Sequence, residues 1–305
     1  MKNTSLTFFA GVMISLVFVT LFSFKKEKSL PPEVSSNQET IGKWQAPPLP
    51  QQLSFAGEEA PITREDIKEK FDKEFLKIYY SQGTMLYLMK LANKNFPIIE
   101  ERLKANGVPL DFKYVCIAES NMQSWARSRS GAVGYWQFMQ GTASGYGLET
   151  NSLVDERRNL AKATDAACKY FKTAKKKFGN WTAAAASFNC GIGGYHSRAA
   201  FQKTNNYYEL YLPEETNKYI LRILSFKYIM ENAEKLGYSL PEEEKYHQEN
   251  YSTFTVKSSI PNLAEFALDH GTTYKILHWM NPWIKGHSLS VKGGKTYTLK
   301  LPEKD

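Results

Sequence analysis

Apolar residues recur at intervals of three and four along most of the chain between residues 61 and 245. In the first such stretch, Ile67, Phe71, Phe75 and Ile78 fall on one face, which predicts an amphipathic helix. Thr63 precedes it, spaced from an acidic residue as in a capping box. Further helices are predicted over 97–105, 111–119, 155–177, 181–188 and 213–235. Without alternating strand patterns between 60 and 240, the fold class is mainly α.

The pattern changes after residue 250. Residues 254–256 and 296–301 are typical of short strands, and residues 260–271 and 274–281 of short helices. We therefore predict a small β-α-α-β module over residues 251–302, separate from an all-α domain over residues 61–245.

The start of the chain has a different character. Residues 6–24 form an uncharged apolar run, long enough to span the hydrocarbon core of a bilayer. Its end is a poor match to a cleavage site, so residues 1–24 are predicted to be an uncleaved signal-anchor in preference to a cleaved signal peptide. Residues 25–60 are rich in Pro, Ser, Gln and Glu, which predicts a disordered linker.

The amino-acid composition indicates a globular protein and argues against a disulfide framework or a metal site. The 305 residues are 42% hydrophobic and 23% charged, which is typical of a globular protein. The net charge of +8 suits nucleic acid, an anionic envelope surface or an acidic polymer, and does not choose among them. The three cysteines lie far apart and the histidines lack metal-ligand spacing, so neither a disulfide framework nor a metal site is predicted.

Candidate chemistry lies on the helix predicted over residues 111–119. Phe112, Val115, Cys116 and Glu119 are spaced to share one face, so a carboxyl group ends an otherwise apolar stripe. Partial burial would raise the pKa of that carboxyl group, as a general acid at neutral pH requires. The alternative is a helix-end glutamate that turns towards solvent, and periodicity alone leaves both open.

Three segments that follow carry amides, hydroxyls and aromatic rings. They are residues 126–139 (ARSRSGAVGYWQFM), 186–191 (ASFNCG) and 213–220 (PEETNKYI). The glycines allow tight backbone turns, and the flat rings and hydrogen-bonding groups suit carbohydrate recognition. Trp136 is at least as well explained by a core position as by a sugar platform.

Together with the Glu-Ser pair at 119–120, these segments resemble the lytic transglycosylases of the soluble lytic transglycosylase and goose-type lysozyme clan. The family pattern has a Glu-Ser pair, Ala-x-Ser and Gly-Ala-x-Gly before a Gln-Met turn, an Ala-Tyr-Asn-x-Gly helix end and a Glu-Thr-x-x-Tyr helix start. All occur here in order over about residues 100–220. Phe188 replaces the usual Tyr, and Cys190 replaces a small residue.

The resemblance implies a lysozyme-like all-α catalytic domain in which Glu119 is the catalytic acid and base and Tyr219 a second catalytic residue. The implied substrate-binding residues are Ser120, Ser128, Ser130, Gln137, Met139, Phe188, Asn189 and Glu215. For Ser120 the implied task is to fix the turn after Glu119. For Glu215, a favourable charge in the first turn of its helix is an equal explanation.

The implied reaction cleaves peptidoglycan between N-acetylmuramic acid and N-acetylglucosamine, leaving 1,6-anhydromuramyl ends and consuming neither water nor a cofactor. Residues 251–302 resemble a degenerate peptidoglycan-binding LysM repeat, in which Ser258 to Pro261 replace the usual Gly-Asp-Thr-Leu turn. A structural cap on the catalytic domain is the alternative for this module.

Two other functions stay open at this stage. One is a lysozyme-type hydrolase, in which an added carboxylate activates water, and the other is a noncatalytic peptidoglycan-binding protein. The expected partners are glycan strands of peptidoglycan and a membrane, through the N-terminal apolar run, and not nucleic acid. The expected location is the cell envelope, on the periplasmic side, either membrane-anchored or exported.

Overall fold

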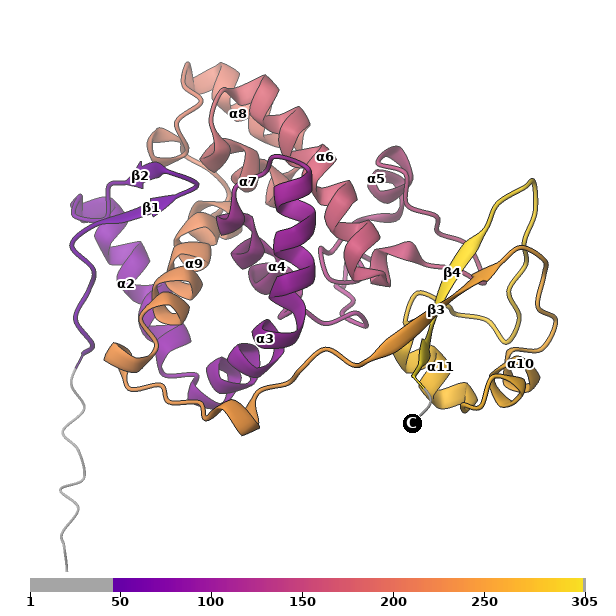
Figure 1. Ribbon diagram of the computed structural model, residues 1–305. Coiled ribbons are helices and arrows are strands. Elements are labelled where there is room, and N and C mark those ends of the chain that lie inside the picture. Colours follow the sequence, from indigo (N-terminus) through magenta and orange to yellow (C-terminus); the bar gives the residue numbers. More distant parts are fainter. Residues whose placement is uncertain (1–45, 304–305) are drawn as a thin grey trace, which may run out of the picture. The chain divides into compact units, whose positions relative to one another are not determined.

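The computed structural model describes residues 46–303 (Figure 1). The apolar run at residues 6–24, predicted to be a signal-anchor or signal peptide, lies outside this range. Within residues 46–303, none of the helices combines the length and apolar character needed to cross a membrane.

Helices dominate the described chain up to residue 245, as predicted. They are α2 (Glu65–Tyr79), α3 (Gln82–Ala105), α4 (Lys113–Ser120), α5 (Gln140–Gly145), α6 (Leu160–Phe178), α7 (Trp181–Cys190), α8 (Ile192–Gln202) and α9 (Glu214–Glu231). Short 3-10 turns are η1 (Leu110–Phe112), η2 (Glu156–Arg158), η3 (Tyr207–Glu209), η4 (Glu234–Leu236) and η5 (Glu242–Glu244). Helix α4 packs against α3 and α9 inside the domain, and α2 packs along α9 (Figure 1). This arrangement brings segments 100 residues apart to one place.

Helix starts were predicted with mixed success. Helix α7 begins at residue 181 as predicted, and Asn180 caps it, its side-chain oxygen accepting from the Ala183 amide at 2.7 Å. The capping box at Thr63 is wrong, because Arg64 is the N-cap of α2 and its guanidinium binds Asp66. Asp155 caps only the turn η2, and α6 begins after a second cap, Asn159.

Helix α3 is much longer than the predicted helix over residues 97–105, because it continues through Pro97 from Gln82. Its buried face carries Met85, Leu88, Ala92, Asn95, Ile99 and Leu103. Burial of this long stripe outweighs the missing amide hydrogen of one proline.

The predicted linker over residues 25–60 is wrong at its end. Strands β1 (Leu53–Phe55) and β2 (Glu58–Ala60) form an antiparallel hairpin. Phe55 is fully buried, with its ring centroid 5.0 Å from that of Phe112. The Glu58 carboxylate accepts from the Trp181 and Thr182 amides at 2.6 and 2.8 Å, capping α7. The polar composition of residues 25–60 predicted disorder, although the segment contains the buried ring of Phe55 and the carboxylate of Glu58 that caps α7.

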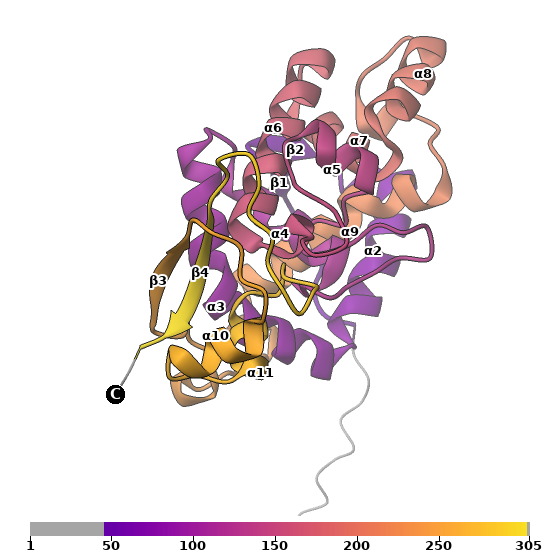
Figure 2. The same cartoon turned by 90° about the vertical axis from the view of Figure 1, so that its right-hand side faces the viewer.

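The C-terminal module has the predicted β-α-α-β order. Strands β3 (Tyr251–Val256) and β4 (Tyr297–Pro302) pair antiparallel, with Tyr251 opposite Pro302, and helices α10 (Leu263–Asp269) and α11 (Tyr274–Met280) lie beside them (Figure 2). Asn281, which is fully buried, exchanges hydrogen bonds with the Lys300 backbone at 2.8 Å and so joins α11 to β4.

Backbone hydrogen bonds attach this module to the segment before α6. The Asp155 amide donates to the Trp283 carbonyl at 2.8 Å, and the Lys285 amide donates to the Leu153 carbonyl at 2.8 Å. Val154 is buried in the apolar core of the module. A Cβ at position 286 would lie 2.5 Å from a methyl of Leu153, so any residue larger than Gly286 would require that side chain to move.

Candidate active site

Glu119 lies in the last turn of α4, on the stripe that the sequence predicted. Phe112, Val115 and Cys116 are fully buried, and Glu119 itself is half-buried. The helix stops immediately afterwards, because Asn121 and Met122 have φ angles of 53° and 57°. Two consecutive left-handed residues other than glycine are unusual and are found preferentially at functional sites. The carboxyl group therefore projects from the end of a helix fixed by buried side chains.

Tyr219 on α9 meets this carboxyl group. Its hydroxyl donates to Oε1 of Glu119, and its ring is 1% exposed. Oε2 of Glu119 has no hydrogen-bond partner among residues 46–303 and is therefore the oxygen that can hold a transferable proton. The structure thus brings together the two residues that the family resemblance implied as catalytic.

The surroundings tune the acidity of Glu119. Burial raises its pKa from 4.5 to about 7, although the Tyr219 hydrogen bond and the Arg222 charge act to lower it. Burial and the nearby Glu119 carboxylate also hold the pKa of Tyr219 well above its usual range, so its hydroxyl remains a donor. A pKa near the working pH suits a group that must first release a proton and then accept one.

Arg222, which sequence reasoning missed, holds the other carboxylates nearby. Its guanidinium donates to Glu74 at 2.9 Å and to Glu215 at 2.7 Å. Burial opposes ionisation of Glu215, but Arg222 and Lys218 outweigh it and lower its pKa. Glu215 is thus an ion-paired carboxylate in the first turn of α9, and its predicted contact with substrate stays a prediction.

A second missed residue, Thr216, orients Asn189. Its hydroxyl donates to Oδ1 of Asn189 at 2.8 Å, and the Asn189 amide nitrogen has no hydrogen-bond partner within residues 46–303. Thr216, Tyr219 and Arg222 are spaced by three residues and so share one face of α9. That spacing was visible in the sequence and could have indicated all three.

The loop after Glu119 is held by its own polar groups. Ser120 is buried, and its hydroxyl donates to the Tyr135 carbonyl at 2.6 Å. The Gln137 side-chain nitrogen donates to the Gly134 carbonyl at 2.8 Å, and the side-chain oxygen has no hydrogen-bond partner in the described part of the chain. Gly134 has φ +83°, and a Cβ there would lie 2.0 Å from the Arg157 carbonyl, so only glycine fits. Ser128 accepts from the Ala132 amide at 3.0 Å.

The remaining predicted binding residues differ in exposure. Ser130 and Met139 are exposed on the same loop, and Phe188 is half-buried, with its ring centroid 4.9 Å from that of Tyr170. Trp136 is a core residue, fully buried, with its indole nitrogen donating to Thr164 at 3.0 Å. Across residues 46–303, no three His, Cys, Asp or Glu side chains are placed to hold a metal ion.

Comparison with known proteins identifies both domains. Residues 96–211 match the family model described as the transglycosylase SLT domain, and residues 252–305 match the soluble lytic transglycosylase C-terminal LysM-like domain. The chain therefore contains an SLT domain and a LysM-like domain. The first of these spans Glu119, Asn189 and the loop between them, and the second spans the β-α-α-β module.

The chain is also similar to two curated proteins and to one solved structure. The membrane-bound lytic murein transglycosylase D proteins of Escherichia coli K12 and of strain O6:H1 are each 28% identical over 201 residues, covering 64% of this chain and 44% of theirs. The chain thus spans less than half the length of these curated relatives. An X-ray structure of an inactive mutant of lytic transglycosylase Slt from Pseudomonas aeruginosa aligns with a TM-score of 0.37 and 21% identity, covering 50% of this chain and 26% of that one.

Proposed function

We propose that the chain is a peptidoglycan lytic transglycosylase, with residues 61–245 as the catalytic domain and residues 251–302 as a peptidoglycan-binding module. The observation that carries this proposal is a single carboxyl group, Glu119, with a pKa of about 7 and a buried hydroxyl partner in Tyr219. Its relatives named lytic murein transglycosylase support the choice of substrate.

The arrangement favours one acid over two. Classical glycosidases use a pair of carboxyl groups, one on each side of the scissile bond. Here Glu74 and Glu215 are both engaged by Arg222. A mechanism in which the substrate supplies its own nucleophile fits a site with one available carboxyl group.

In the proposed reaction, Oε2 of Glu119 gives its proton to the glycosidic oxygen, and the bond from that oxygen to the muramyl anomeric carbon breaks. The muramyl N-acetyl carbonyl stabilises the resulting positive charge. The 6-hydroxyl of the same sugar then bonds to the anomeric carbon, and its proton returns to Glu119. In this reaction Tyr219 holds the carboxylate between the two transfers, and the Asn189 amide nitrogen donates to an N-acetyl oxygen. No water enters the balance.

The product identifies the reaction class. The full chain is incubated with purified peptidoglycan, and the released muropeptides are weighed beside those from a Glu119→Gln variant. We expect products lighter by one water molecule than reducing-end muropeptides, absent with the variant. Reducing-end products that depend on Glu119 would instead establish a hydrolase. Binding to the polymer without any release would establish a noncatalytic protein.

We also propose a location in the cell envelope, on the periplasmic side, with residues 6–24 as the membrane attachment. The uncharged apolar sequence of that run and the membrane-bound relatives support this placement. Fractionation of cells that express the full chain or a chain lacking residues 1–24 tests it: the full chain is expected with membranes and the shorter chain in the soluble fraction.

A further inference from the structure

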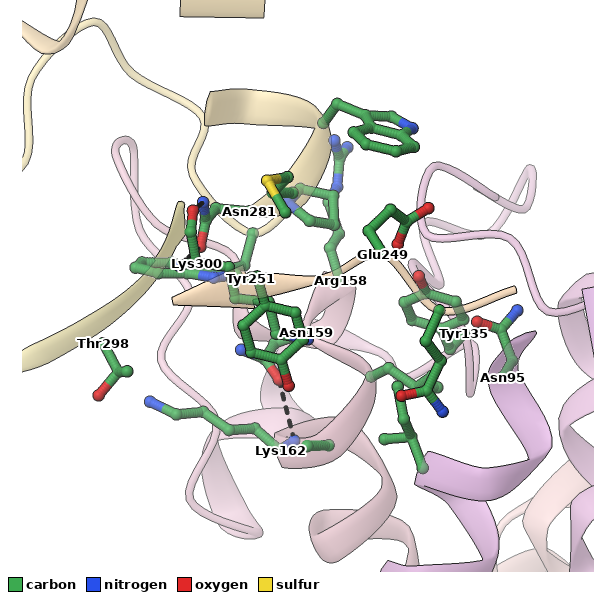
Figure 3. A pocket seen from close by; sticks show the side chains of 18 of the residues that line it. Asn95, Tyr135, Arg158, Asn159, Lys162, Glu249, Tyr251, Asn281, Thr298 and Lys300 are labelled. Carbon is green, nitrogen blue, oxygen red and sulfur yellow. Dashed lines mark hydrogen bonds between the residues drawn. The ribbon is translucent and has the colours of Figure 1, made fainter. Parts of the chain in front are cut away.

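A cleft lined by both polar and apolar side chains lies between the catalytic domain and the LysM-like module, away from Glu119. Its volume is about 320 Å³, and neither Glu119 nor Tyr219 lines it. Residues of α3 and of the start of α6 form one wall, and β3, β4 and the end of α11 form the other (Figure 3). Two of the polar side chains that line it, Arg158 and Asn95, form no side-chain hydrogen bond within residues 46–303.

Arg158 supplies an unpaired positive charge to the cleft. Its guanidinium makes no hydrogen bond or ion pair with any residue from 46 to 303, and its Nε is fully buried without a partner. Buried polar atoms in native proteins are nearly always hydrogen-bonded. A guanidinium group offers a planar fork of donors that matches a carboxylate.

Asn95 supplies an unpaired amide. It is 5% exposed, lines the cleft, and forms no side-chain hydrogen bond within the described part of the chain (Figure 3). It lies on the buried stripe of α3, between Ala92 and Ile99. An amide that both donates and accepts matches a peptide group.

The other charged groups leave the cleft positive. Glu249 is paired with Lys94. Lys300 has no carboxylate partner in residues 46–303, and its amine lies 3.9 Å from the ring centroid of Tyr251. Trp279, which is 56% exposed, adds a flat apolar surface at the rim. The ligand that fits is a short peptide with a free carboxylate.

We infer that this cleft binds the carboxylate-bearing peptide stem of a peptidoglycan strand, with Arg158 on the carboxylate and Asn95 on a peptide group. This assignment rests on the proposed function, because it takes peptidoglycan as the substrate. In a strand that carries stems, the lactyl carboxyl group of the muramyl sugar is bound in an amide, so the free carboxylates belong to the stems.

One loop connects the cleft with the catalytic carboxyl group. The Tyr135 side chain lines the cleft, and the Tyr135 carbonyl accepts the Ser120 hydroxyl next to Glu119. A bound stem would therefore contact the same loop that fixes the end of α4.

Calorimetric titration of the full chain tests the inference, with Glu119→Gln in every protein so that nothing is cleaved. Three probes separate the sources of binding: a disaccharide tetrapeptide, the same disaccharide without peptide and with its lactyl carboxyl group converted to a simple amide, and the free tetrapeptide. Arg158→Gln and Asn95→Ala are compared with Lys275→Gln. Lys275 is exposed on α11 and does not line the cleft, which makes it a matched control.

We expect Arg158→Gln to weaken binding of the disaccharide tetrapeptide and of the free tetrapeptide about tenfold, as for the loss of one charge-assisted hydrogen bond. Asn95→Ala should weaken both about threefold. Lys275→Gln should bind all three probes with unchanged affinity. The affinity for the amidated, peptide-free disaccharide should be the same in every variant. Thermal melting shows whether each variant is folded. Because Asn95 lies on α3 and Arg158 lies in η2, Asn95→Ala tests the cleft independently of Arg158→Gln.

Two results would overturn the inference. One is equal affinity for the tetrapeptide in Asn95→Ala, Arg158→Gln and the control. The other is that inorganic phosphate displaces the disaccharide tetrapeptide while the free tetrapeptide does not bind. That result would mean that the cleft is a general anion site. Since binding is measured without cleavage, failure here is distinct from failure of the proposed lyase activity.

Discussion

The surroundings of Glu119 and the cleft between the domains differ in whether their polar side chains are hydrogen-bonded to other protein groups. Around Glu119, the Tyr219 hydroxyl, the Thr216 hydroxyl and the Arg222 guanidinium are all bonded to other side chains. In the cleft, Arg158 and Asn95 have no partner in residues 46–303. The first arrangement holds a reactive group in one geometry before substrate arrives, as electrostatic preorganisation requires. The second leaves hydrogen bonds to be completed by a ligand.

The largest expected effect is on turnover. Glu119→Gln keeps the shape of the side chain but has no proton to transfer, and general acid and base catalysis contributes about 100-fold to 10,000-fold. We expect the rate of muropeptide release to fall by about 1,000-fold or more, while Lys275→Gln is unaffected. A fall of less than about tenfold would place the chemistry on another residue.

The same substitution should stabilise the fold at neutral pH. Because the pKa of Glu119 is raised from 4.5 to about 7, the folded state holds a proton that the unfolded state has lost in this window. Stability of the native chain therefore falls as pH rises from about 4.5 to 7 and is constant above. Each pKa unit corresponds to about 1.4 kcal/mol, so Glu119→Gln gains up to about 3 kcal/mol at pH 8.

Urea unfolding at pH 4 and pH 8 measures this gain. The two proteins should have the same free energy of unfolding at pH 4, where Glu119 is protonated in both states. An equal difference at both pH values would show that the stability change has another origin than ionisation.

Tyr219→Phe should act on both rate and pH dependence. The hydrogen bond from Tyr219 lowers the pKa of Glu119, so its loss raises that pKa above about 7. Activity needs the protonated acid, so the fall in kcat/KM with rising pH should move to higher pH. The maximum rate should drop about tenfold, since the carboxylate loses one charge-assisted hydrogen bond. A lower rate with an unmoved pH profile would mean a purely structural role.

Sequence predicted best where one pattern repeats over many residues. The all-α domain, the β-α-α-β module and the buried stripe ending at Glu119 all follow from periodicity. The hairpin ending in Ala60 was missed, because three-residue strands carry no periodic signal and depend on one buried ring, that of Phe55. Short elements held by tertiary contacts are where local patterns fail.

The candidate site residues were predicted mainly from the family motifs and less from the physical properties of the residues. Nothing in local sequence joins Glu119 to Tyr219, which are 100 residues apart. The role of Arg222 depends on Glu74, whose helix packs along α9 only in the fold. Asn95, however, carried the same signal as Glu119, a polar residue on an apolar helical stripe. Applied evenly, that criterion would have drawn attention to the cleft as well.

The smallest expected effects are on stability and KM, and they differ between Ser128 and Ser130, two serines of one loop. Ser128 accepts from the Ala132 amide at 3.0 Å, whereas Ser130 is exposed and makes no side-chain hydrogen bond within residues 46–303. Ser128→Ala should lower the free energy of unfolding by about 1 kcal/mol, the usual contribution of one hydrogen bond. Ser130→Ala should leave stability unchanged and, if its hydroxyl meets substrate, raise KM about threefold. These two serines repeat, for single hydroxyl groups, the difference between the Glu119 site and the cleft. The hydrogen-bonded hydroxyl of Ser128 stabilises the loop, and the hydroxyl of Ser130 is available to a ligand. Equal loss of stability in both variants would contradict that distinction.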